Sequence, residues 1–163
     1  YGKEMGKVTF QARKEEGMPK LVNYKFGKLM KAVSLQSGED YEDWRGDHVG
    51  GVGIICIYES QKKRPGEKFI YFFHDDDPEG INVQYLRTTY GEIEENEKEV
   101  RIHTLNSEYT FSFGDYGMSD IDKLGLMLNV GFSYDMIPYD FIVDPYTGKI
   151  KILGIKDRSE KEE

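Results

Sequence analysis

One acidic segment carries the residue types and the spacing closest to a chemical site. Asp75, Asp77 and Glu79 stand at positions one, three and five of a calcium-type loop, and a glycine follows at position six. Leu86, however, stands at position twelve, where such a loop needs a bidentate glutamate, and both flanks have the pattern of strands. The segment is therefore interpreted as an acidic turn. The alternative is a Ca²⁺ or Mg²⁺ site in a metal-dependent hydrolase or phosphodiesterase that uses these three carboxylates, with His74.

The three histidines could in principle join the acidic cluster at a zinc or iron ion, because imidazole and carboxylate suit both metals. The spacing of His48, His74 and His103 along the chain does not support such a site. Cys56 lies in an apolar run, where burial opposes the thiolate that a nucleophile needs. The sequence therefore predicts no catalytic residue.

Aromatic residues indicate a different kind of site. The chain has twelve tyrosines, more than a core of this size has to bury, and surplus tyrosines often line interfaces. Six aromatic residues fall in loop-like segments and form the predicted contact surface; the alternative is that they cover sheet edges and the bases of loops. They are Tyr41, Trp44, Tyr116, Tyr134, Tyr139 and Tyr146.

Two apolar runs, 54–58 and 69–73, are predicted to form the centre of the fold. Neither run has a polar face, so each is expected to form a strand that is buried on both sides, at the centre of a sheet. The connection between them contains Pro65 and Gly66 and three consecutive cations, which indicates a solvated turn. Cations in such a turn do not by themselves indicate binding to nucleic acid.

Alternating apolar and polar residues predict further strands. They cover 8–12, 81–85 and the longer stretch 21–35, in which Gly27 interrupts the alternation as a bend or bulge would. A two-residue turn at Asn106 and Ser107 would pair Thr104 with Tyr109, Ile102 with Phe111 and Val100 with Phe113.

The last third of the chain contains a helix signal and a hairpin signal. Ser119 followed by acidic residues predicts the start of a helix, which Asn129 or Gly131 should end. A four-residue loop containing Pro145 and Gly148 predicts a hairpin in which Asp144 lies opposite Lys149, Val143 opposite Ile150 and Phe141 opposite Ile152.

These elements predict a mainly β fold, an antiparallel β-sandwich or barrel of about eight to ten strands with one short helix near 119–129. We expect a single β-rich domain over residues 1–155 and a charged, frayed tail over 156–163.

Composition narrows the functional classes. The net charge of −8 disfavours direct nucleic-acid binding and mildly favours a basic protein partner. A single cysteine cannot form an internal disulfide, and we see neither a signal peptide nor a membrane span, so a cytoplasmic protein is expected.

The leading hypothesis is a non-catalytic acidic binding protein that contacts a protein partner through loops and tyrosines, as an inhibitor or assembly component. The segment 104–109, Thr-Leu-Asn-Ser-Glu-Tyr, resembles a hairpin of small proteins carried by phages and mobile elements. The resemblance covers six residues and implies a phage origin without a mechanism. Besides the metal-dependent hydrolase, a small-ligand-binding β-barrel is the other alternative.

Overall fold

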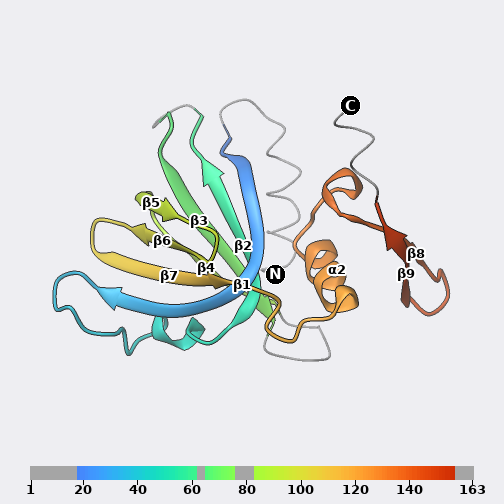
Figure 1. The fold of residues 1–163 in the computed structure, drawn as a ribbon, viewed down its shortest axis with the longest axis horizontal. Coiled ribbons are helices and arrows are strands. Elements are labelled where there is room, and N and C mark those ends of the chain that lie inside the picture. The colour runs from blue at the N-terminus through green and yellow to red at the C-terminus, as the bar shows by residue number, and fades with distance from the viewer. Residues whose placement is uncertain (1–17, 62–64, 76–82, 157–163) are drawn as a thin grey trace.

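The computed structural model describes residues 18–61, 65–75 and 83–156, and in them it contains nine strands, one α-helix and two short 3₁₀ helices (Figure 1). The mainly β class predicted from the sequence is confirmed. The strands are β1 (Lys20–Ser34), β2 (Val52–Glu59), β3 (Lys68–Asp75), β4 (Val83–Arg87), β5 (Glu92–Glu95), β6 (Glu99–His103), β7 (Ser107–Phe113), β8 (Tyr139–Val143) and β9 (Ile150–Ile155). The helices are η1 (Gly46–His48), α2 (Asp120–Asn129) and η2 (Tyr134–Met136).

Seven strands form one antiparallel sheet in the order β4-β3-β2-β1-β7-β6-β5, and β8 and β9 form a second sheet of two strands. The outer strands β4 and β5 are not joined by a ladder. A single bridge between Lys68 and Gly91 connects the start of β3 to the residue before β5. The sheet is therefore not a closed barrel, and of the two predicted architectures the sandwich is the observed one.

The long strand β1 bends the sheet over itself. Residues 20–28 pair with β2 and residues 27–34 pair with β7, so Gly27 lies opposite both Gly53 and Phe113. The register shifts between Leu21 and Asn23 and again between Leu29 and Lys31, and such bulges bend a strand and increase its twist. The predicted bend at Gly27 thus lies between two bulges, within one continuous strand.

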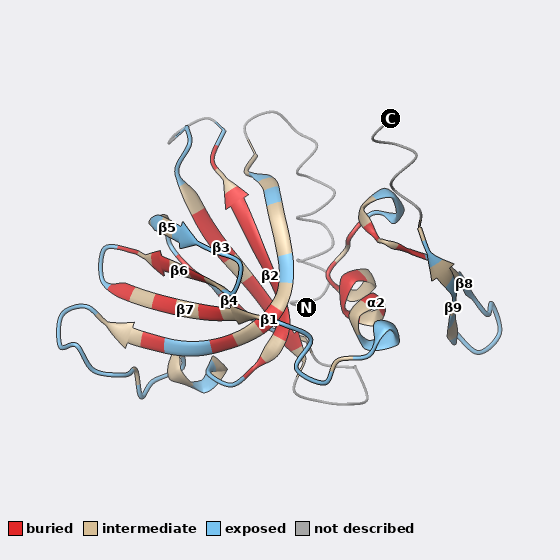
Figure 2. Cartoon of the chain, in the orientation of Figure 1, coloured by how far each residue is buried: buried red, intermediate tan, exposed pale blue. Residues whose placement is uncertain are grey.

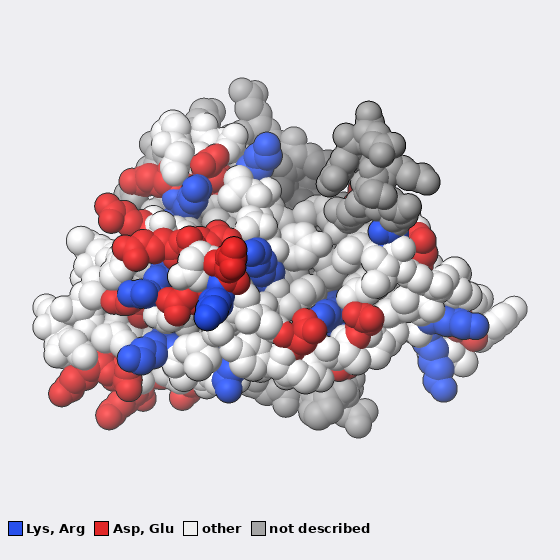
Figure 3. Space-filling model, viewed as in Figure 1, with Lys and Arg blue, Asp and Glu red and all other residues white. Residues whose placement is uncertain are grey.

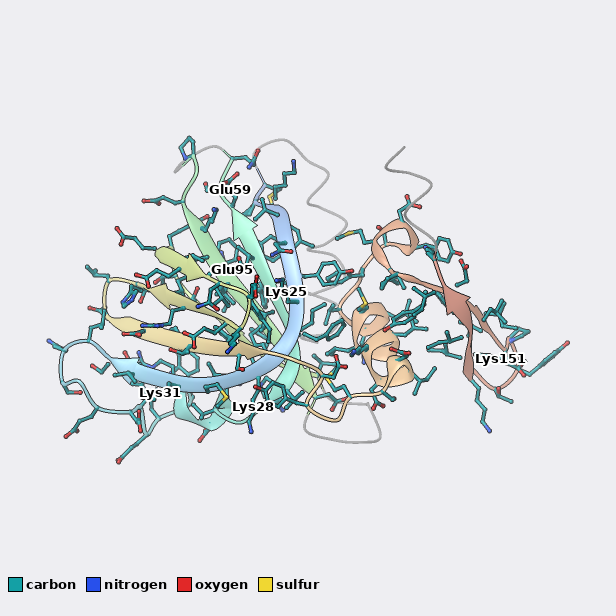
Figure 4. The ribbon with its side chains drawn as sticks, in the orientation of Figure 1. Lys25, Lys28, Lys31, Glu59, Glu95 and Lys151 are labelled. Carbon is teal, nitrogen blue, oxygen red and sulfur yellow. The ribbon has the colours of Figure 1, made fainter. Side chains whose placement is uncertain are left out.

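Side chains from strands that are far apart in the sheet meet inside the bend. The rings of Phe72 on β3 and Phe111 on β7 lie 5.1 Å apart, although β2 and β1 separate their strands. Nearby, Lys25 on β1 lies 3.7 Å from Glu95 on β5 (Figure 4). The core between the two halves of the sheet consists of Leu29, Ala32, Ile55, Ile57, Ile70, Phe72, Leu86, Val100, Ile102, Tyr109 and Phe111.

A second core lies on the other face of β2 and β3, which α2 and the segment after it cover. The side chains of Ile54, Cys56 and Phe69 pack here against Leu124 and Met127 of the helix. This second layer explains why the two apolar runs lack a polar face. Both are buried on both sides, as predicted, and Figure 2 shows β2 buried along most of its length.

The predicted register of β6 and β7 is wrong by two residues. Val100 pairs with Phe111 and Ile102 pairs with Tyr109, because the turn is centred on Leu105 and Asn106 and not on Asn106 and Ser107. The Thr104 hydroxyl accepts a hydrogen bond from the Ser107 amide at 3.1 Å and stabilises this earlier turn. A shift of two leaves every side chain on its predicted face.

The helix and the last hairpin agree with their sequence signals. Ser119 and Asp122 form a reciprocal capping box at the start of α2, which ends before Gly131. The pairs Val143–Ile150 and Phe141–Ile152 form as predicted, and Gly148 has the positive φ, 73°, that the turn requires.

Several sequence predictions fall on residues that the structure does not describe. They are the strand over 8–12, the cations of the β2–β3 turn, the carboxylates Asp77 and Glu79, and residues 157–163 of the predicted tail. In the part of the chain that is described, neither α2 nor the 3₁₀ turns are long and apolar enough to cross a membrane.

Candidate functional site

The loop between β1 and β2 folds back onto the end of the sandwich. The backbone amide of Tyr41 donates to the carbonyl of Ala32, and that of Ser34 donates to the carbonyl of Glu39, both at 2.9 Å. The amide of Leu35 reaches the β6–β7 turn and donates to Asn106, also at 2.9 Å. These hydrogen bonds hold the start of the loop against β1 and the neighbouring hairpin.

Tyr41 connects this loop to the β6–β7 turn. Its hydroxyl is 2.6 Å from the Ser107 hydroxyl and donates to the carbonyl of Asn106 at 3.2 Å. The side chain is only partly exposed. The main role of Tyr41 is therefore to hold the loop in place, and only part of its side chain is exposed for a partner.

Arg45 contacts the rings of both Tyr41 and Trp44 in the loop. Its guanidinium carbon lies 3.9 Å from the centre of the Tyr41 ring and 5.4 Å from that of Trp44. Its Nε atom also donates to both carboxylate oxygens of Asp43, at 3.2 and 3.1 Å. These hydrogen bonds lower the pKa of Asp43 and raise the pKa of Arg45, so both groups stay charged.

Large apolar side chains face solvent around this arrangement. The exposed fractions are 57% for Trp44, 89% for Leu105 and 44% for Leu35. Leu105 precedes Asn106, whose carbonyl accepts hydrogen bonds from the Leu35 amide and the Tyr41 hydroxyl, so the backbone of the β6–β7 turn joins these residues to the loop. We call this set the Trp44 surface: Leu35, Tyr41, Trp44, Arg45 and Leu105.

The Trp44 surface has an acidic border. Residues 35–49 contain five carboxylates, at positions 39, 40, 42, 43 and 47, and Arg45 is the one Lys or Arg among them. Figure 3 shows carboxylates gathered at the lower left of the molecule, the end at which Figure 1 places this loop. The surface is therefore apolar at its centre and negative at its edge.

The six predicted contact residues do not form one surface. Tyr116 follows β7 in a positive-φ conformation and lies under Lys28, whose Nζ is 5.6 Å from the ring centre. Tyr134 and Tyr146 belong to the region of the β8–β9 hairpin, which Figure 1 shows on the opposite side of the molecule from the β1–β2 loop.

Two of these tyrosines differ sharply in exposure. Tyr139 is buried, 6% exposed, and donates to Asp120 at 2.9 Å, so it is a packing residue and its predicted place on an exposed surface is not observed. Tyr146 at the hairpin tip is 95% exposed. Of the predicted set, Tyr41 and Trp44 are brought together by Arg45, which contacts both rings.

Of the predicted metal ligands, only Asp75 lies in the described part of the chain, at the end of β3 opposite Val83. His74, next to it, is buried on the sandwich side and stacks on Phe72, with ring centres 5.1 Å apart. His103 lies elsewhere, on β6, 3.7 Å from Glu108.

Two histidines that are 26 residues apart in the sequence meet in the structure. The Nδ1 atom of His48, in η1, is 2.8 Å from the Nε2 atom of His74, at the end of β3. The contact depends on the path of the β1–β2 loop, and no local sequence motif predicts it. Across the described ranges, no group of three or more His, Cys, Asp or Glu side chains has a metal-binding arrangement.

Comparison with known proteins finds no matching family model, no matching curated protein and no matching solved structure.

Proposed function

We propose that this chain is a non-catalytic binding domain that recognises a protein partner through the Trp44 surface. The observation that carries the proposal is the position of Trp44, the single tryptophan of the chain. It is 57% exposed, and the guanidinium of Arg45 lies beside its ring. An exposed tryptophan beside an arginine, bordered by polar and charged residues, has the residue types of a protein interface.

The residue types of this surface are those that dominate binding energy in protein interfaces. Tryptophan, tyrosine and arginine are enriched at hot spots, and two leucines here enlarge the apolar area. The loop is already held in place by Tyr41 and by the Asp43–Arg45 pair. Less conformational entropy is then lost on binding than a mobile loop would lose.

The acidic border indicates the charge of the partner. Five carboxylates against one arginine favour a partner with Lys or Arg around an apolar centre. Such complementarity accelerates association at low salt and makes the rate depend on ionic strength. An inhibitor or an assembly component acting in the cytoplasm is the role we propose for such a surface.

The other two hypotheses have less support. A metal-dependent hydrolase using Asp75, Asp77 and Glu79 stays a prediction, since two of the three carboxylates lie outside the described residues. A small-ligand barrel would need a closed sheet with a chamber, whereas here the sheet is open and aromatic side chains such as Phe72 and Phe111 fill the space between its halves.

Affinity capture with the immobilised chain, from a lysate of the organism that encodes it, tests the proposal. The partner is then purified and titrated against the wild type, Trp44→Ala and Tyr146→Ala. Loss of a central hot spot is expected to weaken binding by roughly 30-fold or more. Tyr146→Ala is the matched control, because it removes a 95% exposed aromatic ring from the opposite side of the molecule.

Equal affinity of the wild type and Trp44→Ala would reject the Trp44 surface as the contact site. Loss of binding only in Tyr146→Ala would move the site to the β8–β9 hairpin. Failure to capture any saturable partner would contradict the binding function itself.

A further inference from the structure

His48 and His74 bring two imidazole nitrogens to one point. The Nδ1 atom of His48 and the Nε2 atom of His74 are 2.8 Å apart, and the two rings are nearly perpendicular, at 88°. Each ring nitrogen carries either a proton or a lone pair. The contact is therefore either a hydrogen bond between the rings or two nitrogens placed to share a cation.

The ring of His74 is held rigidly by its surroundings. The side chain is 1% exposed, and its ring stacks on Phe72 with an interplanar angle of 19°. Gly51 also lies close to the ring, and an added Cβ there would come within 2.6 Å of the His74 Nδ1 atom. A glycine is thus required at this point for the ring to fit, and the ring offers its Nε2 atom in a fixed direction.

His48 approaches from a different element, the 3₁₀ helix η1. It is half-buried at the end of η1, in the β1–β2 loop, and its ring is nearly perpendicular to that of Trp44, with ring centres 6.3 Å apart. The pair therefore has one ligand from the sheet and one from the loop.

We propose that His48 and His74 bind a transition-metal ion of the zinc class, and that the ion fastens the β1–β2 loop to β3. Imidazole is a preferred ligand of Zn²⁺, Cu²⁺ and Ni²⁺, and a poor ligand of Ca²⁺ and Mg²⁺, which prefer oxygen. Ligands that are distant in the sequence and come from two elements are what a structural clasp needs. This proposal does not depend on the proposed protein partner.

The geometry needs only a small adjustment. With Zn–N distances of about 2.0–2.1 Å and tetrahedral angles, the two nitrogens would lie about 3.3 Å apart. The rings therefore have to separate by roughly half an ångström for an ion to bind between them. Among the described residues no group of three or more His, Cys, Asp or Glu side chains is arranged to hold a metal, so the two imidazoles are the ligands that this proposal names.

The single tryptophan of the chain supplies a reporter next to the site. Cu²⁺ bound by His48 would quench the fluorescence of Trp44 over the short distance between their rings. We expect a saturable quench with one ion per chain, reversed by excess Zn²⁺. His48→Gln is expected to weaken Cu²⁺ binding at least about tenfold, while His103→Gln, the matched control, leaves it within about twofold.

A second measurement follows the melting temperature of the protein. An ion that binds only the folded chain raises the melting temperature, and Zn²⁺ at 100 times its dissociation constant should raise it by about 5–10 °C. Ca²⁺ and Mg²⁺ at the same concentration should have no such effect. Melting of His48→Gln without metal shows whether that variant is folded, and His74→Gln serves as the second variant.

Three results would overturn the proposal. The first is a wild-type chain whose fluorescence and melting temperature respond to neither Cu²⁺ nor Zn²⁺. The second is a response that persists in both His48→Gln and His74→Gln, or that His103→Gln removes. The third is equal stabilisation by Ca²⁺, Mg²⁺ and Zn²⁺, because that pattern indicates carboxylate ligands.

Discussion

Gly27 of β1 packs against the backbone of Ser112 so closely that no side chain fits between them. A Cβ at Gly27 would overlap the carbonyl oxygen of Ser112 and lie 2.8 Å from the Ile55 Cδ1 atom. Contacts of this kind cannot be relieved by rotating a flexible side chain, since one partner is backbone. The two halves of the bent sheet meet here, so the fold depends on the absence of a Cβ at this position.

Gly27→Ala is expected to lower the free energy of unfolding by about 2–4 kcal/mol, because the backbone must move to accept the methyl group. Urea denaturation followed by circular dichroism measures the change. Gly125→Ala is the matched control. Gly125 lies inside α2 and has open space around it, so alanine there should stabilise the protein by roughly 0.5–1 kcal/mol. Equal effects of the two substitutions would contradict this account of the bend.

Thr88, just after β4, supplies a hydrogen bond where the backbone ladder stops. Its hydroxyl accepts from the buried amide of Ile70 at 2.9 Å and donates to the carbonyl of Thr89 at 2.9 Å. Thr88→Val keeps the shape and leaves the Ile70 amide without this acceptor. We expect a loss of about 1–3 kcal/mol in unfolding free energy, measured by urea denaturation. Thr88→Ser keeps the hydroxyl and should lose less; a larger loss in Thr88→Ser than in Thr88→Val would assign the effect to packing.

Most of the strands were predictable because their signals are local, whereas β5 (Glu92–Glu95), in a charged segment, is not among the predicted strands. The runs 54–58 and 69–73 have no polar face, and a sequence of that kind is stable only between two layers. The turn of the β6–β7 hairpin was misplaced because apolar Leu105 was not expected in a turn, and it is 89% exposed there. Thr104 stabilises the observed turn through its side-chain hydroxyl. An Asn-Gly type of turn signal contains no such side-chain contribution.

The candidate sites were less predictable than the strands, because they depend on the path of the β1–β2 loop. Trp44 and Tyr41 were identified from their position in that loop, but the role of Arg45 between them requires three-dimensional contacts. The approach of His48 to His74 requires the same loop to return to the end of β3. Tyr139 has the same residue type as the exposed tyrosines, and only its packing against α2 distinguishes it.

Ser119 begins α2 with a side chain that satisfies an otherwise unpaired helix amide. Its hydroxyl accepts from the Asp122 amide at 3.2 Å, and the Asp122 carboxylate accepts from the Ser119 amide at 3.1 Å. Ser119→Ala is expected to lower the free energy of unfolding by about 1 kcal/mol, again measured in urea. Ser133→Ala is the control, because Ser133 precedes η2 without a side-chain cap and should change stability by less than about 0.5 kcal/mol. A similar loss in both variants would argue against the capping box as the cause.

Tyr139 should make the stability of the protein sensitive to alkaline pH. Burial, followed by the hydrogen bond to Asp120, raises the pKa of Tyr139 from 10.0 to about 12. A tyrosine is neutral below its pKa, and the folded state favours this neutral form. Below pH 10 the tyrosine is neutral in both states, so its contribution to stability is complete. Between pH 10 and about 12 the unfolded chain ionises first, and the contribution is lost as the pH rises.

Urea denaturation of the wild type and Tyr139→Phe at pH 8, 10 and 11.5 measures this contribution as a difference, in which the ionisation of the other tyrosines cancels. The advantage of the wild type over Tyr139→Phe is expected to shrink above pH 10. Asp120→Asn keeps the burial and removes the negative acceptor, so the alkaline loss should be smaller but still present, because burial is the larger cause. Parallel loss of stability in the wild type and Tyr139→Phe between pH 10 and 11.5 would show that Tyr139 ionises equally well in the folded protein, and would contradict the proposed effect of its burial and of its hydrogen bond to Asp120.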